Sequence, residues 1–417
     1  MKILFYGINF APELTGIGKY TGEMAQWFAE QGHEVHVITA PPYYPAWKVS
    51  QGYQNSYSTA QWQGVTVYRA PLWVPAQPSG LKRLIHLASF ALTSLVPLLQ
   101  QWRWKPDVIW VVEPALMCAP AAVAFAKLRG AKAWLHVQDY EVNAAFDMGL
   151  IKAKWLRGIV EACEGWLMRC FDRVSSISGQ MLKLAHAKGV DPQKIVAFPN
   201  WVDISAIYPL KTASPYRQEL NISADKIVAL YSGNMGGKQG LEILAQAAQI
   251  IAAQPNLQIQ FVFCGHGAGR AELEHACATL NNVMFLDLQP LERLSELLGL
   301  ADIHLLPQRA DAADLVMPSK LTGMLASGKA VIATAQPETE LGQVVSKHAN
   351  CGLIVEPENP HALAEAIVQL ANDADTRHRY GSSGRQYAEQ QLSKQQILRQ
   401  FEQDLYSCSV PVKTAVE

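Results

Sequence analysis

The chain has 417 residues, which at about 150 residues per domain predicts two or three domains whose cores need neither disulfides nor a structural metal. Its 35 Lys and Arg nearly balance 36 Asp and Glu, and this near-neutral charge argues against a nucleic-acid binder, which would carry a basic excess. The charge is uneven, because residues 1–200 carry 19 basic and 13 acidic residues, whereas residues 201–417 carry 16 and 23; this indicates two domains, of which the first faces an anionic partner or surface.

The first half alternates short apolar runs with longer helical patterns, which is typical of a parallel sheet flanked by helices. A helix is predicted over 17–31, because Tyr20, Met24, Trp27 and Phe28 share one face and Gly32 follows. Strands are predicted at 2–7, 34–39, 65–70, 107–112, 133–138, 173–178 and 195–198.

The second half repeats this rhythm, with strands predicted at 226–232, 258–265, 302–306, 330–334 and 352–355. Residues 200–221 show no periodicity and contain Pro209 and Pro215, so we interpret them as the linker. The predicted fold class is α/β, with two Rossmann-like domains whose parallel sheets face each other across a cleft. The domains are expected at 1–204 and 205–391, and a C-terminal helix at about 392–417 is expected to pack back on the first.

Cysteine usage and hydropathy predict a cytoplasmic protein. The seven cysteines form no CxxC pair and lie mostly in apolar stretches, which indicates a reducing compartment. The longest apolar stretch, Leu84–Leu99, has 16 residues, short of the roughly 20 that span a bilayer. The segment Leu81–Lys105 nevertheless combines apolar residues with Lys82, Arg83, His86, Arg103, Lys105 and two tryptophans, Trp102 and Trp104. It suits either the interface of an anionic membrane or a helix that covers the sheet.

Five loops follow predicted strands, where open α/β sheets bind ligands. The first runs from Gly7 to Gly18, and Gly16 and Gly18 open the helix that follows. These glycines lack the GxGxxG spacing after the strand, and Tyr20 stands where a Walker loop needs Ser or Thr. Phosphate binding and a plain loop both remain open here.

The second loop, Ser232–Gly240, favours phosphate binding because it holds four glycines and one lysine at a helix start. Its candidate ligand residues are Asn234, Gly236, Gly237 and Lys238. The third loop contains Gly265 and Gly267, for which a turn and a ligand contact are equally open.

The fourth loop, Met317–Lys320, places Ser319 as a helix N-cap and Lys320 in the first turn, where the helix dipole disfavours a cation. Lys320 therefore predicts an anionic ligand. In the fifth loop, strand alternation puts His136 and Gln138 on one face with Asp139 at the exit. A catalytic and a structural role for His136 both remain open.

Sequence motifs predict neither a metal site nor a cofactor. HExxH and GxSxG are absent, and the one DxD, Asp373–Asp375, lies in a polar helical stretch. Metal-independent chemistry is therefore expected.

Several landmarks together resemble the GT-B glycosyltransferases of family 4, which are retaining and metal-independent. They are Phe10–Glu13 with Gly16–Gly18, Pro199–Asp203, Tyr231–Gly233, Gly265–Gly267, Pro318–Leu321 with Ala326–Lys329, and Cys351–Val355. Within that family, Val137–Glu141, Leu315–Thr322 and Thr339–Gly342 resemble the colanic-acid exopolysaccharide branch. The resemblance implies transfer of L-fucose from GDP-fucose, preferred over a UDP-sugar, to a lipid-linked oligosaccharide at the inner face of the cytoplasmic membrane.

Three departures from the family pattern stand out. Asn234 and Gln239 replace the usual Arg and Lys, with Lys238 one position early. Leu315 and Gly323 replace paired glutamates. Gln138 stands near the position of the usual catalytic histidine, so His136 is a candidate substitute.

The resemblance implies a first domain for the acceptor and a second for the donor. Gly236, Gly237, Lys238 and Lys320 would stabilise the leaving diphosphate, helped by Asn234, Gly265, Gly267 and Ser319. Gly16 and Gly18 would close over the phosphates, and His136 or Asp139 would orient the sugar and the acceptor hydroxyl. Two alternatives remain: a nucleotide-sugar epimerase or hydrolase, and a non-catalytic nucleotide-binding scaffold subunit.

Overall fold

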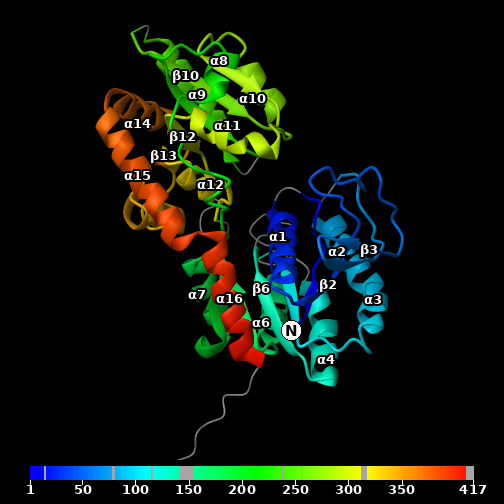
Figure 1. Cartoon of the computed structure of the whole chain (residues 1–417). Helices are drawn as coiled ribbons and strands as arrows, with labels where there is room; N and C mark the ends of the chain where they lie inside the picture. The colour runs from blue at the N-terminus through cyan, green and yellow to red at the C-terminus, as the bar shows by residue number, and fades with distance from the viewer. Residues whose placement is uncertain are drawn as a thin grey trace, which may run out of the picture. The chain divides into compact units, whose positions relative to one another are not determined.

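The computed structural model describes residues 1–13, 16–77, 80–113, 116–140, 154–236, 239–254, 256–310 and 317–409. The chain divides into two compact units, which can be followed in Figure 1, where the colour marks residue number from blue at the N-terminus to red at the C-terminus. Unit 1 comprises Met1–Pro199 with Leu398–Glu417, and unit 2 comprises Asn200–Ile397. Each unit carries a predominantly parallel sheet with helices packed on it, so the predicted α/β class is confirmed.

Unit 1 contains an eight-stranded sheet in the order β3-β4-β2-β1-β5-β6-β7-β8, parallel except between β3 and β4. The strands are β1 (Lys2–Tyr6), β2 (Glu34–Thr39), β3 (Ser58–Trp62), β4 (Val65–Arg69), β5 (Val108–Glu113), β6 (Lys132–Val137), β7 (Arg173–Ser176) and β8 (Ile195–Ala197). The helices are α1 (Gly16–Glu30), α2 (Gly80–Thr93), α3 (Leu95–Gln100), α4 (Ala119–Arg129), α6 (Lys154–Arg169) and α7 (Gly179–Ala187). All seven strands expected in this half are present.

The antiparallel strand β3 was not predicted. Gln63 and Gly64, with φ of 48° and 79°, form the two-residue turn that joins β3 to β4. Four of the five β3 residues are exposed, so the strand has no buried face and no apolar alternation. A sequence pattern based on burial therefore cannot detect it.

Unit 2 contains a six-stranded parallel sheet in the order β11-β10-β9-β12-β13-β14. Its strands are β9 (Ile227–Ser232), β10 (Ile259–Cys264), β11 (Val283–Leu286), β12 (Ile303–Leu306), β13 (Ala330–Thr334) and β14 (Gly352–Val355). The helices are α8 (Pro215–Glu219), α9 (Glu242–Ala252), α10 (Arg270–Ala276), α11 (Leu294–Leu300), α12 (Lys320–Ala326), α13 (Glu340–Gln343), α14 (Pro360–Asn372), α15 (Ala374–Gln391) and α16 (Lys394–Ser409). The last of them, α16, continues into unit 1. Only β11, a four-residue edge strand without a fully buried residue, was not expected.

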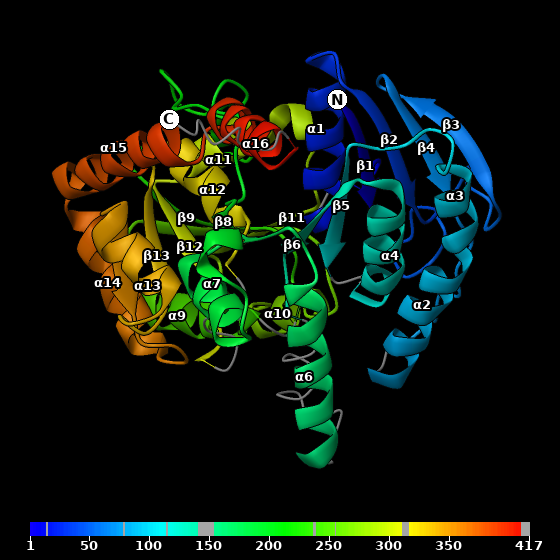
Figure 2. The same ribbon diagram turned by 90° about the horizontal axis from the view of Figure 1, so that it is seen from below.

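Aromatic side chains fill one side of the unit 1 core around the end of the chain. Phe401 on α16 lies 4.6 Å from Trp110 and 4.9 Å from Trp134, measured between ring centroids. The Phe198 ring centroid lies 4.4 Å from that of Phe401. The C-terminal part of α16, labelled in both Figures 1 and 2, therefore belongs to the core of unit 1.

The segment 200–221 is the start of unit 2. Val202 forms a β-bridge with Ser393, and the Arg385 guanidinium donates hydrogen bonds to the carbonyls of Ile204 and Ile207. These contacts place the unit boundaries after Pro199 and Ile397, five and six residues from the boundaries expected at 204 and 391. Apart from the short helix α8, this segment is held by the β-bridge and the Arg385 bonds rather than by a regular element, which explains its lack of periodicity.

Candidate functional site

In unit 2, the loops after β9 and β10 pack closely against each other at the carboxyl ends of their strands. Gly233 N–H donates to Cys264 O over 2.9 Å, and Met235 N–H donates to His266 O over 2.8 Å. A Cβ on Gly265 would lie 1.9 Å from Gly233 O, and one on Gly267 would lie 2.3 Å from Met235 O. These two glycines are therefore required by loop packing, which makes a ligand contact unnecessary to explain them.

Lys320, the first residue of α12, lies against the loop after β9. Its Nζ donates to the Tyr231 hydroxyl over 3.0 Å and lies 4.3 Å from the centroid of that ring. A Cβ on Gly233 would lie 3.3 Å from the same Nζ. Burial lowers the pKa of Lys320 to about 8, and none of the ion pairs between described residues includes this amine. This arrangement fits the anionic ligand that its position predicts.

Ser319 is the N-cap residue of α12, as expected, but it is exposed and its side chain makes no capping hydrogen bond. Gly323 lies where the family carries a glutamate, and a Cβ there would lie 3.2 Å from Leu298 Cδ1. The glycine thus lets α12 pack closely on α11. Leu315 lies outside the described residues.

The anion nest expected after β9 is partly filled by the chain itself. Gly236 N–H donates to Gln239 Oε1 over 3.0 Å, and a Cβ on Gly236 would lie 3.2 Å from the exposed Asn234 side chain. Gly237 and Lys238 lie outside the described residues. The Gln239 amide oxygen therefore accepts the hydrogen bond of the Gly236 N–H, which a phosphate oxygen would otherwise accept.

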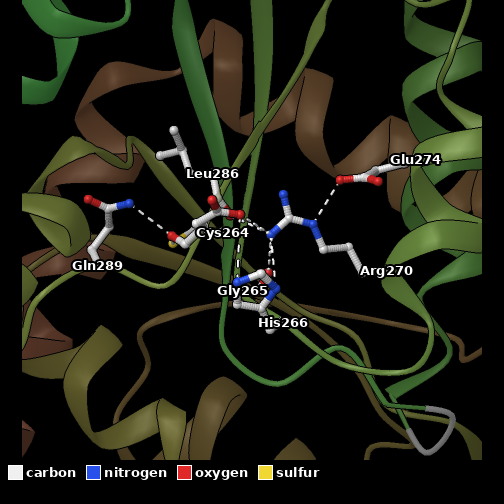
Figure 3. Close-up of polar contacts among 8 residues, drawn as sticks. Cys264, Gly265, His266, Arg270, Glu274, Leu286 and Gln289 are labelled. Atoms are coloured by element: carbon white, nitrogen blue, oxygen red, sulfur yellow. Dashed lines mark hydrogen bonds and ion pairs between the residues drawn. The ribbon is translucent and has the colours of Figure 1, made fainter.

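Arg270 on α10 joins the loops after β10 and β11, as Figure 3 shows. Its Nη1 donates to Gly265 O over 2.8 Å and to Asp287 Oδ1 over 2.7 Å, while its Nε donates to Glu274 over 2.7 Å. Both carboxylates neutralise this guanidinium. Arg270 therefore holds the loops together, whereas Lys320 forms no ion pair with another described residue.

In unit 1, the buried Glu13 carboxylate links the loop after β1 to the loop after β2. Glu13 Oε1 accepts the N–H groups of Tyr43 and Tyr44 at 3.1 and 3.0 Å, and its Oε2 accepts from Asn9. A Cβ on Gly18 would lie 2.7 Å from Glu13, so that glycine makes room for the carboxylate. Gly16 has a φ of 59° and open space where its Cβ would lie, so a ligand can approach its backbone.

His136 is buried, with 2 % of its surface exposed, and stacks on Trp110. Burial lowers its pKa to about 3, so the ring is neutral at pH 7. Gln138 Nε2 donates to its Nε2 over 2.9 Å, which leaves Nδ1–H to donate to Ser175 Oγ over 2.9 Å. In the described packing His136 contacts Gln138, Ser175 and Trp110, and its catalytic role stays a prediction. The ring positions Gln138.

Asp139 follows β6 and is half-buried at the same end of the sheet. Burial first, and then the negative charges of Asp139 and Glu13, raise the pKa of Tyr44, whose side chain is 38 % exposed. The loops after β1, β2 and β6 therefore bring Glu13, Tyr44 and Asp139 close together.

Three residues at this end of unit 1 were missed in the sequence: Glu13, Tyr44 and Glu113. Glu113 ends β5, is fully buried, and its charge contributes to raising the pKa of Tyr140. A carboxylate at the end of an otherwise apolar strand, Val108–Val112, is a signal that could have identified it. Glu13 belongs to the landmark Phe10–Glu13, but its contact with the Tyr44 loop gave no signal, because only folding brings the two loops together.

Among the described residues, no group of three or more His, Cys, Asp and Glu side chains is placed to hold a metal ion.

Comparisons with known proteins agree on a family. Residues 15–201 match the model of a glycosyl transferase 4-like domain, and residues 213–387 match glycosyl transferases group 1. The "Putative colanic acid biosynthesis glycosyl transferase WcaI" of Escherichia coli (strain K12) is 45 % identical over 412 residues, 97 % of this chain and 100 % of that protein.

Solved structures show the same fold. Sucrose-phosphate synthase from Thermosynechococcus elongatus aligns with a TM-score of 0.75 and 18 % identity over 97 % of this chain and 98 % of its own. Anabaena HepE in complex with UDP-glucose aligns with a TM-score of 0.68 and 17 % identity over 98 % of this chain and 100 % of its own.

Proposed function

The chain belongs to the GT-B glycosyltransferases that join a glycosyl transferase 4-like domain to a glycosyl transferases group 1 domain, and from this premise we propose its substrates. We propose a retaining, metal-independent transfer of L-fucose from GDP-fucose to a lipid-linked oligosaccharide of a colanic-acid-type exopolysaccharide. The observation that carries this proposal is the 45 % identity to the colanic acid relative over its full length. The enzyme would act in the cytoplasm, at the inner face of the cytoplasmic membrane.

The donor diphosphate would bind unit 2 beside Lys320. An ammonium group in a half-buried site without a carboxylate partner interacts more strongly with a phosphate than an exposed one does. As the bond to the sugar breaks, negative charge grows on the diphosphate, and Lys320 would stabilise it more in the transition state than in the ground state. Gly237 and Lys238 remain candidates for the same role, as do the backbone of Asn234 and Gly236.

The acceptor would bind unit 1 at the ends of β1, β2 and β6. Asp139 would accept a hydrogen bond from a sugar or acceptor hydroxyl, and the exposed ring of Tyr44 offers a surface for a sugar. His136 would act through Gln138, whose amide it holds. Gly16 would approach the donor phosphates, whereas Gly18 would support that loop through Glu13. In a retaining mechanism the donor phosphate itself takes the acceptor proton, so no protein base is required.

A thermal-shift screen with GDP, UDP, ADP and dTDP, with and without Mg²⁺, tests the donor proposal. A ligand at 100 times its Kd adds about 2.7 kcal/mol to the free energy of unfolding, which is readily measured. We expect a shift with GDP that does not require Mg²⁺. A shift with UDP alone would contradict the fucosyl donor and keep the transferase, while a shift that needs Mg²⁺ would contradict the metal-independent mechanism.

A further inference from the structure

The outer faces of α2 and α3 carry an exposed apolar row. Its members recur at helical spacing and are 36–71 % exposed: Leu81, Leu84, Ile85, Leu92, Leu95, Val96 and Leu99. Figure 2 shows the two helices in succession in unit 1, with α4 beside them. Seven large apolar side chains exposed on two successive helices are unfavourable in water unless a partner covers them.

The opposite faces of the same helices are already used by the core of unit 1. His86 and Phe90 are buried, and Ser94 Oγ, between the helices, lies 2.7 Å from the Tyr6 hydroxyl oxygen. His86 Nδ1 lies 2.6 Å from Trp73 O, and burial lowers the pKa of this histidine, so it adds no cation to the outer face. Covering the sheet therefore accounts for the inner faces and leaves the apolar row unexplained.

The segment Gly80–Gln100 is also long and apolar enough to cross a membrane. Its inner residues are held by the core of unit 1, however, and withdrawing them would expose Phe90 and Leu98. A helix with one face in a protein core and one apolar face outside is suited to lying along a bilayer surface rather than crossing it.

The charged residues around the apolar row indicate which kind of partner surface it fits. No Asp or Glu occurs from Ala70 to Pro106. Exposed Lys82 and Arg83 stand at the start of the row, and exposed Arg103 and Lys105 follow its end. Trp102 is 41 % exposed at that end, with the Arg129 guanidinium 4.5 Å from its ring centroid. Trp104, by contrast, stacks on His36 at 3.7 Å and serves unit 1 itself.

We propose that the apolar row docks unit 1 on an anionic lipid bilayer, with its leucines in the headgroup–acyl boundary and its cations on the lipid phosphates. A second copy of this chain is a poorer partner for the apolar row, because its Lys82, Arg83, Arg103 and Lys105 would face the same four cations of the first copy. The inference rests on the proposed function in one respect: a lipid-linked acceptor is presented at such a surface.

Vesicle flotation with the full chain tests the proposal. Wild-type protein is expected to float with vesicles of phosphatidylethanolamine and phosphatidylglycerol, less at high salt, and far less with phosphatidylcholine alone. Leu81→Glu/Leu92→Glu, at positions 71 % and 70 % exposed, should reduce binding roughly tenfold or more. The matched control Ile159→Glu/Leu291→Glu, at positions 52 % and 55 % exposed, changes the charge equally and should bind like wild type.

Three outcomes would overturn the proposal: no flotation of the wild-type protein, equal loss in both double variants, or a lipid-free dimer that only Leu81→Glu/Leu92→Glu dissociates. The nucleotide thermal shift of the same variant separates this failure from failure of the proposed function. We expect that shift to be retained, because both substitutions lie in unit 1 and the proposed donor site lies in unit 2.

Discussion

At the scale of single residues, the candidate site depends on which polar groups the fold satisfies internally. Arg270 and Glu13 are both satisfied by neighbours, and His136 is buried in an aromatic core. Lys320 forms no ion pair among the described residues, and Asp139 is half-buried where β6 ends. Residue type alone did not separate these two groups, because a lysine, an arginine and a histidine at strand ends are equally plausible ligands before packing is known.

Lys320→Met is expected to weaken binding of the nucleoside diphosphate by about 1.5–3 kcal/mol, roughly 10- to 150-fold, because a hydrogen bond to a charged group is lost. Calorimetry on this variant and on Lys211→Met, an exposed lysine of unit 2, measures the effect. Equal losses in both variants would remove Lys320 from the site.

The lowered pKa of Lys320, about 8, also predicts the pH dependence of binding. Below pH 8 the amine is charged and ready for the diphosphate. Above pH 8 binding must first take up a proton, so the affinity of the wild-type protein should fall by up to about tenfold per pH unit. The stability of the free protein should change in the opposite direction: because the pKa in the folded state is below the unfolded value, stability should rise between about pH 8 and 10.5. Lys320→Met should remove both dependences.

Gln239→Ala is expected to raise affinity for the same nucleotide about fivefold. In the wild-type protein the ligand must first displace the Gln239 amide from the Gly236 N–H, which costs about 1 kcal/mol, and the variant removes this cost. Gln249→Ala on α9, which loses a hydrogen bond to Ala276 O, is the matched control. A weaker affinity in Gln239→Ala would mean that the amide itself contacts the ligand.

Asp139→Asn is expected to lower the rate of sugar transfer by roughly 10²-fold or more while leaving nucleotide affinity unchanged, because it alters only the proposed acceptor side. Transfer assays beside calorimetry measure the two effects separately. Asp191→Asn, an exposed aspartate in the same unit, should transfer at the wild-type rate. Loss of nucleotide binding in Asp139→Asn would place this carboxylate on the donor instead.

At the scale of elements, apolar runs located the buried strands, such as β5, and helix periodicity located α1, within one or two residues. The elements missed, β3 and β11, are edge strands. An edge strand is held by backbone hydrogen bonds to one neighbour, and it need not bury a side-chain face. Its sequence therefore carries little of the signal on which such predictions depend.

Phe401→Ala tests whether α16 is part of the unit 1 core. The ring contacts Trp110, Trp134 and Phe198, so we expect the substitution to lower the free energy of unfolding by about 3–5 kcal/mol. Chemical denaturation followed by tryptophan fluorescence measures this loss. Tyr406→Ala on the same helix, at a position 46 % exposed, should cost far less.

At the scale of the whole molecule, the sequence by itself determined that the chain has two α/β units. It also determined which loops follow the strands, and it carried the family resemblance that the comparisons confirm. It could do so because burial imposes a regular apolar pattern on strands and helices, and because glycine loops occur at fixed places between them. The excess of basic residues in the first half was likewise visible without a structure.

Only the tertiary structure showed which neighbours surround each candidate residue. Gly265, Gly267 and Gly18 are required by close packing, Gln239 fills a donor expected for phosphate, and His136 lies beneath Gln138 rather than at the surface. It also showed that α2 and α3 keep one apolar face in the core and one outside. The physical reason is that burial and hydrogen-bond satisfaction depend on neighbours that are distant in the chain, and a sequence does not record their distances.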